Sequence, residues 1–411
     1  MENTILVACD LHDKNLVTHR AVGRGTVTKQ TFGNSCSGRK HMLANLKQLS
    51  VHLNGAPVFF AYEASGLGFG LYDELTAAGL KCFVLAPSKI ARSPKHRYNK
   101  DDDKDTAHIL ELLRGHVLAG NPLPAVWIPD PQTRDDREIV RTRLDAQAKS
   151  SRIKTQIRTL LKRNSISKPQ NAGAGWTIKF CVWLRTLAAC AEPLAAGGRV
   201  ALSSLLRQLE CQEAEVAVLD KEIEKLSKMP RYAPAVQEIH ATLKGAGLLT
   251  SMVFLTEMGD LNRFKNRRQV GAYLGLTPSS DETGETADRK GHITHQGSPR
   301  VRYVLCQAVW NRVRSDAHEK TIYEGIVKKN PKHKKIAVVA IMRRLAVRLW
   351  RAGLRARAAA INKIPAAVPQ KNGAFKAHWN VALKKKAHAQ RKACAIPASR
   401  RVTRQCCPAQ V

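Results

Sequence analysis

The chain has 411 residues, with 68 Lys and Arg against 33 Asp and Glu, so its formal net charge is +35. A hydrophobic fraction of 44% is ordinary for globular protein and excludes wholesale disorder. No apolar run reaches the roughly 18 residues needed to cross a bilayer. The charge excess favours a polyanionic partner, with nucleic acid the first choice and an anionic membrane the second.

The N-terminal stretch MENTILVACD has no basic segment before its apolar run. It therefore predicts a first buried strand and not a signal peptide. The ten cysteines form no CxxC pair and no Cys/His ligand cluster. We expect Cys9 and Cys82 to be reduced core thiols and the pair at 406–407 to be free, which fits a reducing cytoplasm.

Residues 1–125 alternate strand and helix signals. Strands are predicted at 5–9, 16–19, 26–32, 57–62 and 82–85, and helices at about 42–53, 71–78 and 102–119. Three hairpin-linked strands followed by helix, strand, helix, strand and helix match an α/β RNase H-like (RuvC-like) domain.

Four prolines between 122 and 131 mark the end of this domain, and 131–230 is predicted to be a helical coiled-coil region. From Leu202 to Leu226, mostly apolar residues recur at alternating steps of three and four, which is a coiled-coil pattern. A homodimer is the favoured explanation, although two antiparallel helices of one chain would give the same stripe. A mainly α unit is expected at 231–350 and a basic tail at 351–411, since no acidic residue follows Glu324.

Four acids are spaced as a metal site would require. Asp10 and Glu63 each end an apolar strand, where open sheets place their sites. Asp102 and Asp105, within KDDDKDTA, are three apart at a helix start and share one face. Together they could hold one or two Mg²⁺ ions, which prefer hard oxygen ligands and can clamp a phosphodiester.

Each acid also has a simpler explanation. Asp10 could be a turn residue, Glu63 could cap a helix, and Asp102 and Asp105 could favour a helix N-terminus through its dipole. Their shared order of two strand ends and a helix pair favours the metal site. The neighbours at 101 and 103 are then solvated or weak outer groups.

These motifs resemble the DEDD transposases of the IS110 family of insertion sequences. The resemblance rests on Asp10, on Glu63 within YEASG, and on the aspartates of K-x-D-x-x-D, and it covers roughly residues 1–350. The segments LKGAGLLTSMVFLTEMGDLNRFKNRRQVGAYLGLTP and TGETADRKGHITHQGSPRVRYVLCQAVW are similar to the family's C-terminal transposase domain.

The resemblance implies a RuvC-like domain, a coiled-coil linker and a C-terminal domain with a nucleophilic serine. It also implies DNA ends and target as substrates, a structured guide RNA, a homo-oligomer and a bacterial, nucleoid-associated setting. In the family the serine precedes a glycine after GLTP, whereas here Thr283 precedes Gly284. A threonine hydroxyl can act as a nucleophile. Ser279 or Ser280 could replace it, or the copy could be inactive.

Further residues are predicted to contact nucleic acid. Leu243–Gly247 resembles a helix-hairpin-helix turn whose glycines let backbone N–H groups approach phosphate, although a plain glycine turn is the alternative. His292 and His295 could assist proton transfer or simply lie at the surface. The predicted contacts are Gly245, Gly247, Lys265, Arg267, Arg268, Arg289, Lys290, Arg300 and Arg302.

Two other functions also fit parts of the sequence. A RuvC-like nuclease would hydrolyse DNA with water and would not need Thr283. A nucleic-acid-packaging protein would not depend on Asp10. The ordered acids argue against packaging, since carboxylates on a DNA-binding face weaken binding without a metal.

Overall fold

A computed structural model describes residues 3–90, 102–280, 290–329, 331 and 334–362. The chain forms two compact units, residues 1–222 with 256–260, and residues 223–255 with 261 onward. The predictions at Thr283, Arg289, the cysteine pair 406–407 and most of the basic tail lie outside the described residues. Within the described ranges, no helix is long and apolar enough to cross a membrane.

The first unit begins with a five-stranded sheet in the order β3-β2-β1-β4-β5. Its strands are β1 (Ile5–Leu11), β2 (Asn15–Val22), β3 (Thr28–Gly33), β4 (Val58–Glu63) and β5 (Lys81–Leu85). The pairs β1–β2 and β2–β3 are antiparallel, whereas β1–β4 and β4–β5 are parallel. The prediction of an α/β sheet domain followed by a mostly helical remainder is confirmed.

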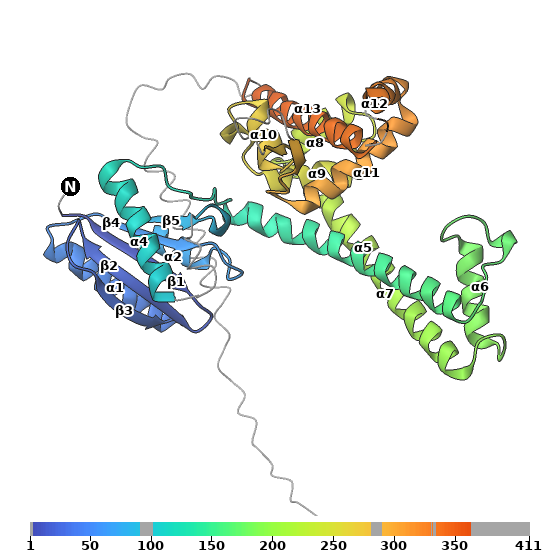
Figure 1. The fold of residues 1–411 in the computed structure, drawn as a ribbon, viewed down its shortest axis with the longest axis horizontal. Coiled ribbons are helices and arrows are strands. Elements are labelled where there is room, and N and C mark those ends of the chain that lie inside the picture. Colours follow the sequence, from blue (N-terminus) through green and yellow to red (C-terminus); the bar gives the residue numbers. More distant parts are fainter. Residues whose placement is uncertain (1–2, 91–101, 281–289, 330, 332–333, 363–411) are drawn as a thin grey trace, which may run out of the picture. The chain divides into compact units, whose positions relative to one another are not determined.

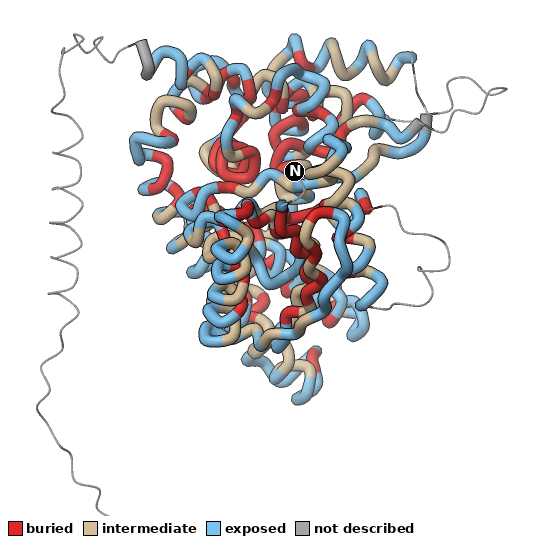
Figure 2. Tube along the Cα trace, turned by 90° about the vertical axis from the view of Figure 1, so that its left-hand side faces the viewer, coloured by how far each residue is buried: buried red, intermediate tan, exposed pale blue. Residues whose placement is uncertain are grey.

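Helices cover both faces of this sheet (Figure 1). They are α1 (Cys36–His52), α2 (Gly70–Ala77) and α4 (Asp102–Ala119), with a short 3₁₀ turn η1 (Pro87–Lys89). Because successive side chains of a strand point to opposite faces, Ile5, Val7 and Cys9 pack with α1 and α2. Leu6 and Ala8 pack on the other face with Ile109, Leu110 and Leu113 of α4. Because both faces are covered, residues 5–9 of β1 are all buried. Figure 2 colours the trace by burial, with buried residues in red.

Cys9 and Cys82 are free thiols in this core, as predicted. Burial raises the pKa of both thiols, well above the ordinary value for Cys9 and to about 12 for Cys82. Neither ionises near neutral pH, so both act as small apolar side chains.

A long helical hairpin follows the sheet. It consists of α5 (Pro131–Arg163), the turn η2 (Gln170–Ala172), α6 (Ile178–Ala189) and α7 (Ala196–Ser227). The last proline of the predicted boundary is the first residue of α5, and the Asp130 carboxylate caps the helix by accepting from the Thr133 backbone N–H at 2.9 Å.

The two long helices lie against each other within one chain. Ile153, Ile157 and Leu160 of α5 pack with Leu202, Leu206 and Leu209 of α7. Ion pairs join Arg143 to Asp220 at 2.8 Å and Lys154 to Glu213 at 2.7 Å. Much of the three-and-four stripe of α7 is therefore covered by a helix of the same chain, the alternative that the pattern left open beside a dimer.

The second unit is mainly helical. Its elements are α8 (Ala233–Thr242), α9 (Leu248–Met258), η3 (Leu261–Arg263), α10 (Arg267–Tyr273), β6 (Pro278–Ser280), β7 (Lys290–Ile293), α11 (Pro299–Ser315), α12 (Ala317–Lys329) and α13 (Lys334–Asn362). The small antiparallel hairpin β6–β7 carries no strong strand pattern in the sequence. The helix α13 continues through residue 350, where the sequence places the end of this unit.

Candidate active site

Asp10 and Glu63 lie at the carboxyl ends of adjacent parallel strands. The register pairs Cys9 of β1 with Tyr62 of β4, so Asp10 and Glu63 are the next residues along each strand. By alternation they share the sheet face of Leu6, Ala8 and Ala61, which α4 covers. Both are half-buried. The sheet thus brings together two acids that are 53 positions apart in sequence.

The helix α4 carries the other two predicted acids onto the same face. Asp102 is its first residue, four before the buried Thr106, and the half-buried Asp105 lies four before the buried Ile109. Residues four apart share one side of a helix, so both positions continue the stripe that packs on the sheet. The side chain of Asp102 lies outside what the structure describes.

Asp10 is held by a neighbour that no sequence pattern indicated. The His12 imidazole lies 3.1 Å from its carboxylate, and the Asp10 side chain is 23% exposed. The β1–β2 turn that bears His12 is closed by a hydrogen bond from the His12 backbone N–H to the Asn15 carbonyl at 2.9 Å. His12 can therefore orient this carboxylate without blocking its access to solvent.

Asp103 is more than a solvated neighbour of the predicted ligands. Its carboxylate accepts a hydrogen bond from the Lys29 ammonium at 2.5 Å. The other carboxylate oxygen lies 3.3 Å from Nε2 of the buried His19. Hydrogen bonds from Lys29 and His19 lower the pKa of this carboxyl below its ordinary value. The latch formed by Asp103, His19 and Lys29 ties the first turn of α4 to β2 and β3.

No sequence signal pointed to this latch, because its three members come from three separate elements. His19 lies on β2 opposite Ala8 in the register, a pairing that the local sequence does not contain.

The donors at this edge suit a hard divalent cation, since all four are carboxylates. Among the described residues, however, no group of three or more His, Cys, Asp or Glu side chains is arranged to hold a metal ion. Asp10, Glu63 and Asp105 thus share a face without forming a closed ligand set. Carboxylates that lie close together repel one another unless a cation lies between them.

Of the predicted hydroxyl nucleophiles, only Ser279 has a described side chain. Its hydroxyl donates to the His292 carbonyl at 3.0 Å, across the β6–β7 hairpin. Ser280 ends β6, and the structure does not describe its side chain. Thr283 lies in the segment that joins the two strands, outside the described residues. His292 is an exposed residue of β7, and His295 is exposed just after this strand.

The predicted nucleic-acid contacts divide into exposed and internally bonded groups. Lys265, Arg267 and Arg268 are exposed at the start of α10. Arg302 instead donates to the carbonyls of Leu274 at 3.2 Å and Gly297 at 3.0 Å, and burial lowers its pKa. The half-buried Arg300 is the second residue of α11, and Lys290 begins β7 with its side chain outside the described atoms. The exposed three are therefore the best placed to meet a phosphate backbone.

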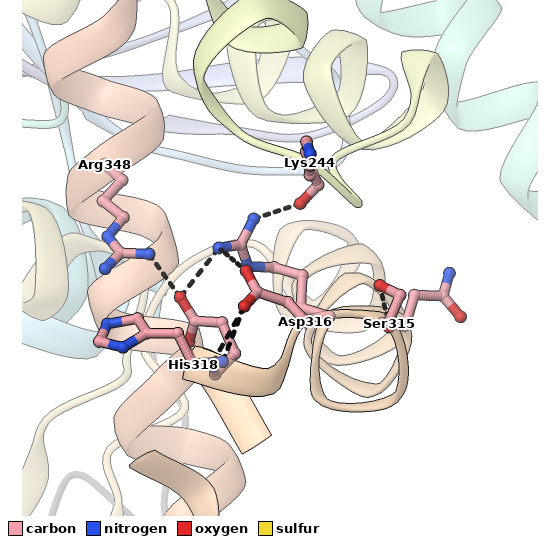
Figure 3. A network of polar contacts seen from close by, with 8 residues as sticks. Lys244, Ser315, Asp316, His318 and Arg348 are labelled. Carbon is pink, nitrogen blue, oxygen red and sulfur yellow. Dashed lines mark hydrogen bonds and ion pairs between the residues drawn. The ribbon is translucent and has the colours of Figure 1, made fainter. Parts of the chain in front are cut away.

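The Leu243–Gly247 turn joins α8 to α9 as the sequence predicts. Gly245 has φ +83°, and a Cβ there would lie 2.8 Å from the Arg312 side chain. Arg312 donates to the Lys244 carbonyl of this turn and to Glu319 at 2.8 Å. Figure 3 shows this network, in which Arg348 of α13 also donates a hydrogen bond to the Glu319 carboxylate. A buried ion-pair network thus fixes the turn.

Sequence comparisons identify the family. Residues 8–165 match a DEDD transposase family of the IS110 type, described as "Transposase", and residues 237–324 match "Transposase IS116/IS110/IS902 family". The chain belongs to the IS110 family of transposases. The resemblance that the sequence carries is thereby confirmed, and the chain is an enzyme of the DNA transposase class.

Relatives of this IS110-family chain carry matching names. It is 32% identical to "Putative transposase y4qE" of Sinorhizobium fredii over 253 aligned residues. This alignment covers 62% of this chain and 58% of the relative. It is 27% identical to "Putative transposase y4rJ" of the same organism, over 84% of this chain and 91% of the relative. It is 23% identical to "Transposase for insertion sequence element IS1533" of Leptospira borgpetersenii, over 64% of this chain and 73% of the relative. The DEDD match is consistent with use of a divalent metal in general.

Proposed function

We propose that this IS110-family chain cuts and rejoins the DNA of its insertion sequence, and that Asp10, Glu63, Asp102 and Asp105 bind Mg²⁺ beside the reacting phosphate. The observation that carries the proposal is the placement of the acids. Two end adjacent parallel strands on one sheet face, and two begin the helix that covers that face.

We assign the sheet domain to the RNase H-like, RuvC-like class. Its order β3-β2-β1-β4-β5, with three antiparallel strands followed by two parallel ones, supports this assignment. In such a sheet, ligands bind beyond the carboxyl ends of the parallel strands. That edge is where Asp10 and Glu63 lie.

The surrounding residues would prepare this edge for a phosphate. Mg²⁺, when bound, supplies charge that polarises the phosphate and stabilises developing negative charge. His12 orients the Asp10 carboxylate. The Asp103 latch holds the first turn of α4 so that positions 102 and 105 stay over the strand ends.

We propose Thr283 as the nucleophile. Its hydroxyl oxygen forms a bond to a DNA phosphorus, the bond from phosphorus to one strand oxygen breaks, and that strand leaves as a hydroxyl after gaining a proton. A hydroxyl of a DNA strand then attacks the same phosphorus, which breaks the bond to Thr283 and joins the phosphate to the new strand. The threonine oxygen regains a proton, and the energy of the phosphodiester bond is conserved. The Ser279 hydroxyl already donates to the His292 carbonyl, which favours Thr283 over Ser279.

The partners follow from the same proposal. A structured guide RNA that pairs with donor and target DNA would select the sites, in a bacterial, nucleoid-associated setting. The high positive charge supports backbone binding, and an aromatic content of 5% argues against base stacking as its main source. A homodimer or larger assembly would bring the Thr283 hydroxyl of one subunit and the four acids of another into one composite active site. The exposed Val218 of α7 is a candidate contact for a second copy.

The test is covalent capture. The protein is incubated with junction DNA of its element, the flanking non-coding RNA and Mg²⁺, and denaturing gels are examined for a protein–DNA adduct. We expect Thr283→Ala to abolish the adduct and Asp10→Asn to lower it by roughly 100-fold or more. Asp13→Asn changes an exposed acid just after β1 and should leave the adduct unchanged.

Other results would select a different function. Nicked DNA without any adduct, and with full cutting by Thr283→Ala, would identify a hydrolytic nuclease. Binding without cutting or adduct in the presence of RNA and Mg²⁺ would identify an inactive copy.

A further inference from the structure

The loop end of the α5–α7 hairpin carries a pocket of about 610 Å³. Its lining residues come from the end of α5, the segment that follows it and the start of α6. Figure 1 shows this segment of the chain between α5 and α6. Its main lining side chains are Arg158, Leu161, Lys162, Ile166, Lys168 and Phe180. Ser165 lines it too and has φ +55°, a left-handed conformation that is uncommon for a residue other than glycine.

The polar wall of this pocket is positive. Arg158 and Lys162 are exposed and lie four residues apart on α5, so they project from the same side of the helix. The Lys168 ammonium lies 4.3 Å from the centre of the Phe180 ring and donates to the Gly175 carbonyl at 2.5 Å. No Asp or Glu lines the pocket in the described part of the chain. Three cations without an acid are mutually repulsive until an anion lies among them.

The floor of the pocket is apolar and well supported. Leu161 and Phe180 are 5% and 3% exposed and belong to the core of the hairpin. The Phe180 ring contacts Trp176 with centroids 5.1 Å apart and stacks on Trp183 at 5.7 Å. Leu161 and Phe180 thus form a rigid support beneath the pocket, and the half-buried Ile166 is the apolar lining side chain left for a ligand to contact.

We propose that this pocket binds one nucleotide of a single-stranded nucleic acid. Its phosphate would lie among Arg158, Lys162 and Lys168, and its sugar or base would contact Ile166, which the buried Leu161 and Phe180 support from below. An acidic peptide would use the cations but would leave the apolar floor without a matching group. The site stands apart from strand transfer, because it involves neither the four acids nor Thr283.

The experiment maps cross-links in the full chain. A single-stranded RNA and a DNA of matching sequence are each irradiated with the protein, and cross-linked peptides are identified by mass spectrometry. We expect a cross-linked peptide from residues 158–180. The charge reversals Arg158→Glu and Lys162→Glu, made together, should lower its yield by about tenfold. Lys149→Glu with Arg152→Glu makes the same charge change at exposed positions of the same helix and should leave the yield unchanged.

Each result decides the proposal. Circular dichroism and the melting temperature establish that both double variants are folded. Preference for RNA would assign the pocket to a guide strand, and preference for DNA would assign it to an unpaired element or target strand. The proposal is overturned if no peptide from 158–180 is cross-linked, if both double variants lose the cross-link equally, or if polyglutamate competes as well as the oligonucleotide.

Discussion

Asp103 shows how much one side chain can add to a site built from others. It is half exposed, yet it joins the start of α4 to a buried histidine of β2 and a lysine of β3. Groups that orient metal ligands affect activity nearly as strongly as the ligands do. The crowded aspartates of KDDDKDTA therefore divide into proposed ligands and a residue that holds the helix in place.

The latch makes a first prediction. Asp103→Asn removes the charge that Lys29 and His19 engage, so the first turn of α4 is held less tightly. We expect strand cleavage to fall by roughly tenfold or more, with a higher Mg²⁺ concentration needed for half-maximal rate. Glu111→Gln changes another exposed acid of α4, whose partner is Arg114, and serves as the control. Equal kinetics for the two variants would contradict the positioning role.

Glu319 makes a second prediction, in the second unit. Burial acts to raise the pKa of this carboxyl, but hydrogen bonds and charges from Arg312 and Arg348 outweigh burial and lower it below the ordinary value. Glu319→Gln leaves two arginines without their carboxylate and should lower the free energy of unfolding by about 3 kcal/mol. Urea denaturation measures this cost, and Glu324→Gln at an exposed position of α12 is the matched control.

The sign of the pH effect follows from the lowered pKa. A carboxyl whose pKa is lower in the folded state stabilises the protein above its unfolded pKa, near 4.3 for a glutamate. That contribution disappears as pH falls from there through the folded pKa. Glu319→Gln should therefore differ from the unmodified protein at pH 7 and approach it in acid. A difference that is independent of pH would show that the carboxylate charge does not matter.

At the scale of elements, the α8–α9 turn combines a special backbone with a buried network. Gly245 occupies a left-handed conformation against Arg312, whereas Gly247 has open space around its Cα. The sequence predicts both glycines as nucleic-acid contacts, but only Gly245 is required by the packing of the turn.

The two glycines make a matched pair of variants. Gly245→Ala introduces strain and a clash with Arg312, so we expect a loss of about 2 kcal/mol in stability and weaker nucleic-acid binding. Gly247→Ala should leave stability nearly unchanged and weaken binding only if the backbone approaches a phosphate there. Thermal unfolding and binding titrations of both variants separate the two effects. Equal stability of the two variants would show that the turn relaxes around the new methyl group.

At the scale of the whole molecule, net charge is the dominant feature. A protein of charge +35 binds polyanions through release of their counterions, so its affinity falls steeply with salt. Much of the charge lies after Glu324, in a stretch without acids that includes Lys384–Lys386 and Arg400–Arg401.

The tail can be tested by truncation. A chain that ends at Asn362, the last residue of α13, retains every described element. We expect its plot of log affinity against log salt concentration to have a shallower slope, by about one for each phosphate that the tail neutralises, while its melting temperature stays the same. An unchanged slope would show that the tail does not bind the nucleic acid.

The sequence by itself determined the strands and main helices of the sheet domain and their order. Apolar runs and turn residues located the five strands of the sheet, and α4 begins and ends within the predicted range, because these patterns are local. The acids at strand ends were also visible, since a strand's alternation and its last residue can be read from a few neighbours. The short β6–β7 hairpin escaped detection because three or four residues carry too little pattern.

Only the tertiary structure decided which groups meet. The register of β1 and β4 placed Asp10 beside Glu63, and the packing of α4 selected Asp103, His19 and Lys29 as a latch. The stripe of α7 was compatible with a second copy, the favoured explanation, and also with a helix of the same chain, because one apolar seam has the same spacing in both cases. The pairing of α7 with α5 is set by side-chain contacts between residues far apart in the chain, which a local pattern does not contain.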